Sequence, residues 1–197
     1  MKKGTKILAM AGTVAALGAS IIPLSSYAAT TNTATITVRI GETLAMTVNG
    51  GEVPISSTVN MSANATDETI EHTINVATNN TNGYNLTVID QDEDNTLKRD
   101  ASHYISPITE GAALVASTPS WGYKVKTGDS YEANYHPVPT SDDVDGAAVL
   151  RNNDGTNITT SSFNENTYVK YGIATGSSVS GEYTDTVVYT VTGNPSS

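Results

Sequence analysis

Alternation of apolar and polar residues with a period of two is the feature of this sequence that most constrains its fold. It is clearest near the C-terminus, in residues 167–173 (T-Y-V-K-Y-G-I) and 183–192 (Y-T-D-T-V-V-Y-T-V-T). Successive side chains of a β-strand point to opposite faces, and Tyr, Val and Thr are residues that strands favour. The two segments therefore predict two antiparallel, half-buried strands joined through the Gly- and Ser-rich stretch 175–182. Because such a pair is not stable alone, the rest of the chain must supply further strands.

The same alternation recurs through the chain. It is found in residues 34–40, 44–48, 70–76, 84–88 and 121–126. We expect 70–76 and 84–88 to form a hairpin across the polar turn 77–83. No amphipathic stretch reaches three helical turns, so the sequence predicts an all-β fold. The expected architecture is an antiparallel β-sandwich of about eight strands, Ig-like or jelly-roll-like.

The first 28 residues have the pattern of a secretory signal peptide. Three lysines precede a mostly apolar run from Ile7 to Leu24, and Ser26-Tyr27-Ala28 offers small residues at the −3 and −1 positions of a cleavage site. The alternative is that the segment is retained as a membrane anchor. We interpret 1–28 as a cleaved leader and 29–197 as one domain, secreted or held at the cell surface.

Charge and cysteine content exclude several classes of protein. Without the leader the chain has 7 basic and 20 acidic residues, a formal net charge of −13. Binding to nucleic acid or to anionic membranes needs clustered Lys and Arg, so neither partner is expected. There is no cysteine, so burial and hydrogen bonds alone must hold the domain together. No second long apolar run follows the leader, so we expect no membrane span after cleavage.

Four segments carry a resemblance to a known type of protein. They are 33–40 (T-A-T-I-T-V-R-I), 76–88 (V-A-T-N-N-T-N-G-Y-N-L-T-V), 120–125 (S-W-G-Y-K-V) and 171–192. With these segments the mature chain resembles small exported domains of Gram-positive-style bacteria. Its closing stretch is similar to the end of WxL-type wall-associated proteins and of spore-coat or pilin-like sandwiches. The resemblance implies a β-sandwich displayed at the cell surface. The sequence departs from the WxL motif, because Trp121 is followed by Gly-Tyr.

An acidic run is the first candidate site. Asp90, Asp92, Asp94 and Asn95 place oxygen ligands at mostly alternate positions, which suits Ca²⁺. An EF-hand loop would need Gly at Asn95 and Glu at Ala101, and both are missing. A solvated loop is therefore the favoured interpretation, with Ca²⁺ as the only cofactor that the sequence suggests.

Aromatic residues are the second candidate. Trp121, Tyr123, Tyr131 and Tyr135 would offer ring faces on which a sugar could stack. Trp121 and Tyr123 alternate in phase with Val125, however, and this phase predicts that they face the core. Tyr131 and Tyr135 fall in a loop, and we expect them to be the exposed pair.

Asp185 is the third candidate, because it shares the inward phase of Tyr183 and Val187. A carboxylate that points inward needs a partner. Lys170 or Lys124 could form an ion pair with it, or even an amide cross-link of the pilin kind. The simpler alternative is an aspartate at a strand end that reaches solvent.

Nothing in the sequence indicates catalysis. There is no Gly-x-Ser-x-Gly elbow and no cysteine nucleophile, and the paired acids lie in segments that resemble turns. We expect a non-enzymatic structural or adhesive protein whose partners are other surface proteins, copies of itself or cell-wall polysaccharide. The alternative is a carbohydrate-binding module that uses the loop aromatics.

Overall fold

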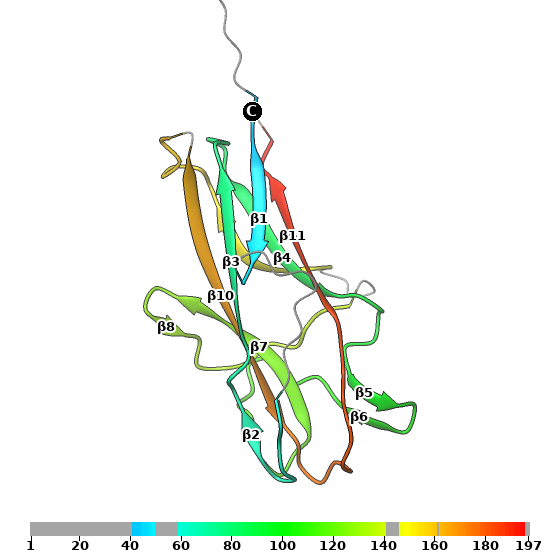
Figure 1. The fold of residues 1–197 in the computed structure, drawn as a ribbon. Helices are drawn as coiled ribbons and strands as arrows, with labels where there is room; N and C mark the ends of the chain where they lie inside the picture. The colour runs from blue at the N-terminus through cyan, green and yellow to red at the C-terminus, as the bar shows by residue number, and fades with distance from the viewer. Residues whose placement is uncertain (1–40, 50–58, 141–145, 161, 196–197) are drawn as a thin grey trace, which may run out of the picture. The chain divides into compact units, whose positions relative to one another are not determined.

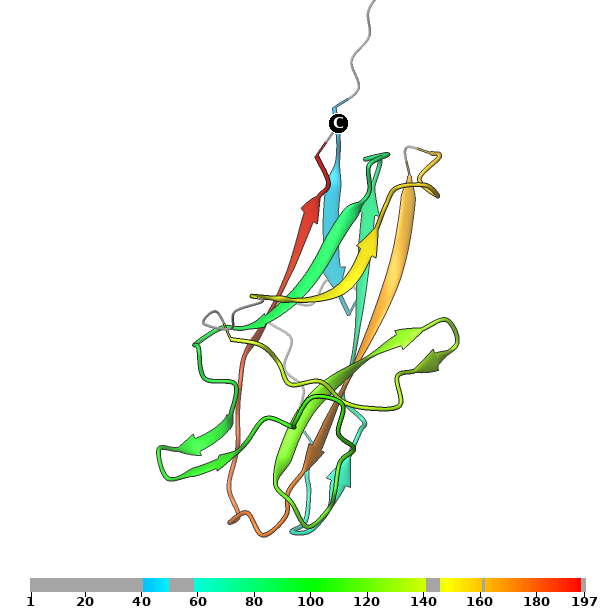
Figure 2. The ribbon, with the colours of Figure 1, turned by 180° about the vertical axis from the view of Figure 1, so that it is seen from behind.

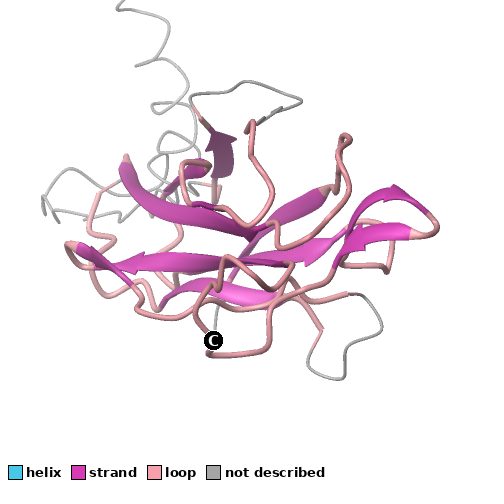
Figure 3. Ribbon diagram, turned by 90° about the horizontal axis from the view of Figure 1, so that it is seen from below, coloured by secondary structure: helices cyan, strands magenta, loops and turns pink. Residues whose placement is uncertain are grey.

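The computed structural model describes residues 41–49, 59–140, 146–160 and 162–195, which belong to one compact unit beginning at Gly41. The expected leader 1–28 and the strand expected over 34–40 lie outside the described residues. Within the described part the chain forms strands and loops and no helix (Figure 3). Accordingly, it contains no helix with the length and apolar character needed to cross a membrane.

The described residues form eleven strands, rather than the eight expected (Figure 1). They are β1 (Leu44–Val48), β2 (Thr66–Asp67), β3 (Glu71–Thr78), β4 (Tyr84–Asp90), β5 (Leu97–Asp100), β6 (His103–Ile105), β7 (Ser120–Thr127), β8 (Ser130–Tyr131), β9 (Ala148–Asn153), β10 (Phe163–Ala174) and β11 (Val187–Gly193). β2, β5, β6 and β8 span only two to four residues, too few to show an alternation in the sequence.

All paired strands within these sheets are antiparallel. The large sheet has the order β1-β3-β10-β7-β8, with β2 also paired to β10. The small sheet has the order β11-β4-β9, and β5 pairs with β6 as a separate hairpin. The antiparallel all-β sandwich that the alternation predicts is confirmed.

The core lies between the large and small sheets. β3 buries every second residue from His72 to Thr78, and β4 does the same from Tyr84 to Asp90. Val169 and Tyr171 of β10 join this buried set. Alternation in each sheet therefore supplies one half of the core, as expected when two half-buried sheets pack face to face.

The hairpin expected from 70–76 and 84–88 is wrong. β3 pairs with β1 and β10 in the large sheet, whereas β4 pairs with β11 and β9 in the small one. Residues 79–83 cross from one sheet to the other. Packed sheets lie about 10 Å apart, and a five-residue connection can span that gap as well as reverse the chain within one sheet.

The C-terminal pair departs from expectation in the same way. β10 belongs to the large sheet and β11 to the small sheet, so residues 175–186 also connect the two layers (Figure 1). The inward faces of β10 and β11 meet across the core. Tyr171 Oη lies 2.7 Å from Tyr189 Oη, and His72 Nδ1 lies 2.8 Å from the same Tyr189 oxygen. His72 is thus a hydrogen-bonded core residue, which is the interpretation that its apolar face favours.

Asparagines close one end of the sandwich, where β4 begins and β11 ends. The Asn194 amide donates to the carbonyls of Asn82 and Asn153, at 2.9 and 3.0 Å, and the Asn80 amide donates to Asn194 O at 2.9 Å. The Asn82 N–H in turn donates to Asn80 Oδ1 at 2.8 Å. We call these four residues the asparagine network. It connects the 79–83 crossing, the end of β9 and the end of β11.

Candidate metal centre

Asp90 is placed by the alternation of β4. It follows Tyr84, Leu86 and Val88 on the buried face, and its side chain is only 3% exposed. Its N–H donates to Pro139 O at 2.8 Å, and its Oδ1 accepts the Asp92 N–H at 2.8 Å. Its Oδ2 is buried with no hydrogen-bond partner. A buried carboxylate oxygen without a donor is costly, so this position favours a nearby cation or a proton shared with another carboxyl group.

Asp185 reaches the same place from the segment that precedes β11, the neighbour of β4 in the small sheet. β11 pairs with β4 so that Val187 lies opposite Asp90, and Asp185 precedes Val187 by two residues on the same face. Gln91 N–H donates to Thr186 O at 3.0 Å, which holds the two segments together. Asp185 Oδ1 accepts the Thr186 N–H at 2.6 Å, whereas Asp185 Oδ2 is buried without a partner. The inward orientation predicted from its phase is therefore correct.

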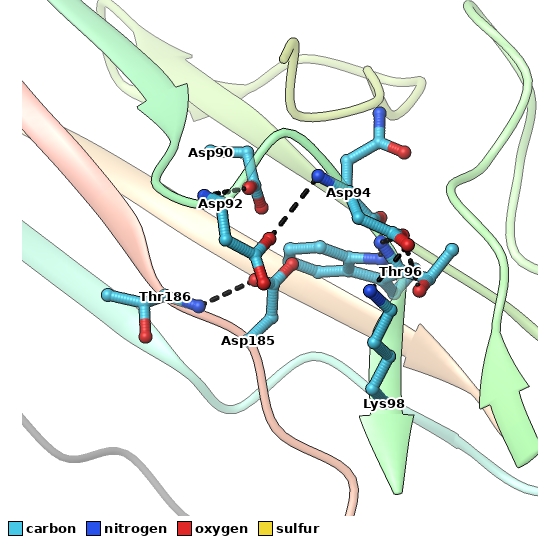
Figure 4. Close-up of polar contacts among 9 residues, drawn as sticks. Asp90, Asp92, Asp94, Thr96, Lys98, Asp185 and Thr186 are labelled. Atoms are coloured by element: carbon cyan, nitrogen blue, oxygen red, sulfur yellow. Dashed lines mark hydrogen bonds and ion pairs between the residues drawn. The ribbon is translucent and has the colours of Figure 1, made fainter. Parts of the chain in front are cut away.

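Asp92 completes a group of three acids that we call the carboxylate cluster. One oxygen each from Asp90, Asp92 and Asp185 can be chosen so that all lie within 4.8 Å of one another. Figure 4 shows the three side chains converging. Desolvation raises the pKa of Asp185 to about 8, and the neighbouring Asp90 and Asp92 act in the same direction. Without a counter-charge, the cluster is therefore unfavourable in its fully ionised state.

Lys98 is a basic residue beside the cluster, but it forms an ion pair with Asp94. Its Nζ lies 2.5 Å from Asp94 Oδ2, and this contact is the main cause of the raised pKa of Lys98, with smaller contributions from Asp92 and Asp185. Lys98 lines a cavity of about 190 Å³ beside the cluster. The other lining residues are Gln91, Asp92, Thr96, Thr184, Asp185 and Thr186. The lysine therefore contributes positive potential at the rim without being hydrogen-bonded to the orphaned oxygens.

The structure divides the acidic run that the sequence singled out. Asp90 and Asp92 enter the cluster, whereas Asp94 accepts hydrogen bonds from the backbone and hydroxyl of Thr96 and pairs with Lys98. Asn95 turns the other way, and its amide donates to Val138 O at 2.7 Å. Proximity in sequence therefore predicts only Asp90 and Asp92 of the carboxylate cluster, because Asp185 comes from a distant segment of the chain.

The lysines proposed as partners of Asp185 lie elsewhere. Lys124 and Lys170 are directly paired across β7 and β10, on the face of the large sheet opposite the core. Lys124 Nζ lies 3.0 Å from Glu68 Oε2, and Lys170 Nζ lies 4.3 Å from the centre of the Tyr131 ring. The structure thus does not bring either lysine to Asp185. The inward phase of Asp185 was the one signal in the sequence for a third ligand. An inward carboxylate was expected to pair with a basic residue, however, and not to lie beside other carboxylates.

The four candidate aromatics do not form an exposed platform. Trp121 and Tyr123 are core residues, as their phase predicts, and the Trp121 ring N–H donates to Asn95 O at 2.8 Å. The expectation that Tyr135 is exposed is wrong, because its side chain is 2% exposed. A Cβ placed on Gly172 would lie 2.5 Å from the Tyr135 ring, so the tyrosine packs directly against that glycine. Tyr131 is half-buried and hydrogen-bonded to Glu71.

Chemically, the carboxylate cluster is a set of hard oxygen ligands. Carboxylate oxygens suit Ca²⁺, Mg²⁺ or Mn²⁺, whereas zinc and copper prefer sites that include His or Cys. The sheet holds Asp90 and the turn after β4 holds Asp92, while Asp185 is positioned through the pairing of β4 with β11.

Comparison with models of protein families, with curated proteins and with solved structures finds no match to this chain.

Proposed function

We propose that this chain is a non-enzymatic structural or adhesive protein, exported and displayed at the cell surface, which acts through contacts between strands. Copies of itself are the partner we favour, ahead of other surface proteins or cell-wall polysaccharide. The leader-like residues 1–28, the acidic composition and the resemblance to wall-associated and pilin-like domains support export and display. A two-sheet sandwich suits a protein that acts by binding to other molecules and not by catalysing a reaction.

The observation that carries the proposal is a pair of open strand edges on one side of the sandwich. Among the described residues, β9 pairs only with β4. The first half of β10 pairs only with β3, because its pairing with β7 begins at Val169. β9 and this half of β10 run along the same side of the molecule (Figure 2). Arg151 of β9 and Glu165 of β10 form an ion pair. Unpaired strand edges are templates for an added strand.

Residues 33–40 have the composition of such an added strand. Ile36, Val38 and Ile40 alternate with Thr and Arg, and the segment precedes the compact unit that begins at Gly41. An extended segment that joins an open sheet edge gains backbone hydrogen bonds, and its alternate side chains supply specificity. In this proposal residues 33–40 of one copy add to the edge of β9 or β10 of another.

Deletion of residues 29–40 tests this assembly. Chains 29–197 and 41–197 would be compared by light scattering coupled to size-exclusion chromatography. The longer chain is expected to form oligomers and the shorter one to remain a soluble monomer. Equal mass distributions for the two chains would refute the proposal.

Two matched pairs of variants locate the contact. Ile36→Lys with Val38→Lys should abolish oligomers, whereas Thr35→Lys with Thr37→Lys adds the same charge to the opposite face and should weaken them less. On the receiving side, Val149 of β9 is 57% exposed and Val179, in the loop after β10, is 46% exposed. Val149→Lys should reduce assembly and Val179→Lys should not.

A further inference from the structure

We propose that Asp90, Asp92 and Asp185 bind one Ca²⁺ ion, which joins the end of β4 to the segment that enters β11. The proposal does not depend on the assembly described above.

Convergence of acids is not sufficient evidence for a metal site, since acids often gather on surfaces. The second observation is the burial of Asp90. Its side chain is only 3% exposed and points into the cluster, and its Oδ2 has no donor (Figure 4). Asp185 Oδ2 is orphaned in the same way. Two carboxylate oxygens without a donor, from separate segments and with a third acid beside them, are compensated by a shared cation or by a shared proton.

A bound cation fits this requirement better than Lys98 does. The Lys98 ammonium is held by Asp94, and the surface near it opens into the cavity of about 190 Å³. That space can hold the water ligands that complete the coordination shell of a Ca²⁺ ion. A single shared proton would satisfy one pair of oxygens and leave two negative charges in the cluster.

Coordination geometry favours Ca²⁺ over Mg²⁺. The three carboxylate oxygens lie within 4.8 Å of one another, a separation that both ions allow. Ca²⁺ accepts irregular shells of six to eight oxygens, whereas Mg²⁺ demands a near-ideal octahedron. Ligands from two different segments can therefore satisfy the coordination geometry of Ca²⁺ more readily than that of Mg²⁺.

Calcium titration of the metal-stripped chain 29–197 tests the site. We expect calorimetry to give one Ca²⁺ per chain, with an affinity in the range of about 10⁻⁴ to 10⁻³ M that is typical of extracellular modules. Mg²⁺ should bind at least tenfold more weakly. Saturating Ca²⁺ should raise the unfolding temperature by about 3–8 °C, because a ligand that binds only the folded state stabilises it.

Asp185→Asn is the decisive variant. It should weaken Ca²⁺ binding at least tenfold while leaving the metal-free protein folded, since it keeps the shape of the side chain and adds no charge. Asp154→Asn is the matched control, because Asp154 caps a turn by accepting from Thr156 and lies outside the cluster. It should leave Ca²⁺ affinity unchanged.

Two results would overturn the proposal. One is the absence of any heat or thermal shift at millimolar Ca²⁺, which would leave a shared proton as the explanation of the cluster. The other is Ca²⁺ binding by Asp185→Asn with the affinity of the unmodified chain.

Discussion

The two ends of β4 are closed by side chains of nearly the same size and opposite hydrogen-bonding character. At its start, amide side chains from three segments meet, and within the described residues none of the four asparagines of the network leaves a buried side-chain atom without a partner. At its end, carboxylates from two segments meet, and Asp90 and Asp185 each leave one oxygen unpartnered. Both ends connect β4 to the same strand, β11.

The difference follows from the donor inventory of the two side chains. An amide carries donors and an acceptor, so asparagines can satisfy one another and nearby backbone carbonyls. An ionised carboxylate only accepts, so a group of carboxylates has no internal means of closing its hydrogen bonds. The asparagine network is therefore satisfied by hydrogen bonds within the chain, including those of Asn153 with Glu165 and Gly155. The carboxylate cluster instead needs a bound proton or cation.

The largest expected effect on stability comes from a substitution at Gly83, which lies at the asparagine end of β4. This glycine has φ +85°, and a Cβ placed on it would lie 1.8 Å from Asn153 O. Gly83→Ala adds a steric clash to the backbone strain, so we expect a loss of about 3–5 kcal/mol in the free energy of unfolding. Chemical denaturation measures it.

Gly111→Ala is the matched control for that experiment. Gly111 has φ +73°, and a Cβ placed on it would meet nothing within 4 Å, so only the backbone strain applies. We expect a loss of about 1–2 kcal/mol. Equal losses for the two variants would show that the close approach to Asn153 contributes nothing.

The second prediction concerns a substitution that places a carboxylate at the asparagine end of β4. Asn194→Asp keeps the shape of the side chain but replaces the amide that donates to the carbonyls of Asn82 and Asn153. Two donors are lost and acceptors then face each other, so we expect a loss of about 2–3 kcal/mol in the free energy of unfolding. Asn157→Asp, at an exposed position, makes the same chemical change and should alter stability by less than about 0.5 kcal/mol. A similar loss in both would attribute the effect to net charge.

The smallest expected effect concerns the pH dependence of the metal-free protein, because Asp185 is only partly buried and solvent screens its charge. Burial raises the pKa of Asp185 to about 8 in the folded state, from an ordinary value of 3.8. Between these values the folded state holds a proton that the unfolded state has released, so ionisation favours unfolding and stability falls as pH rises from about 4 to 8. Asp90, Asp92 and Lys98 are the charged groups around Asp185 that shape this window.

The difference between the unmodified chain and Asp185→Asn isolates this contribution. The variant should unfold at a temperature a few degrees higher at pH 8 and at the same temperature near pH 4, in buffers that contain a chelator. Thermal unfolding across this range measures the two curves. Parallel curves would mean that Asp185 has the same pKa in the folded and unfolded states. The carboxylate cluster would then make no pH-dependent contribution to stability.

The carboxylate cluster was only partly predictable from the sequence. Asp90 and Asp92 stand out as spaced acids, and the phase of Asp185 indicates that it points inward. Nothing in the sequence connects them, because the connection is the register that places Val187 opposite Asp90. Asp94 has the same spacing as its neighbours, yet the turn directs it to Thr96 and Lys98.

Tyr135 shows a second kind of limit. It lies in a segment rich in Pro, Asp and Glu with no alternation, which is typical of an exposed loop. Its ring is buried because Gly172, on another strand, leaves room for it, and because the Tyr135 backbone exchanges hydrogen bonds with Ala112 and Gly111. A loop residue is buried by what it packs against, and that partner is distant in sequence.

By itself the sequence determined the main strands and the face to which each side chain points, including the inward positions of His72, Trp121 and Asp185. Period-two alternation indicates which face of a strand is buried, and the alternation is a local property of each strand. Only the tertiary structure decided which strands pair, because an apolar face looks the same whether its strand continues the neighbour's sheet or crosses to the opposite one. Both segment pairs expected as hairpins are divided between the sheets for this reason, and the same crossings bring Asp90, Asp92 and Asp185 together.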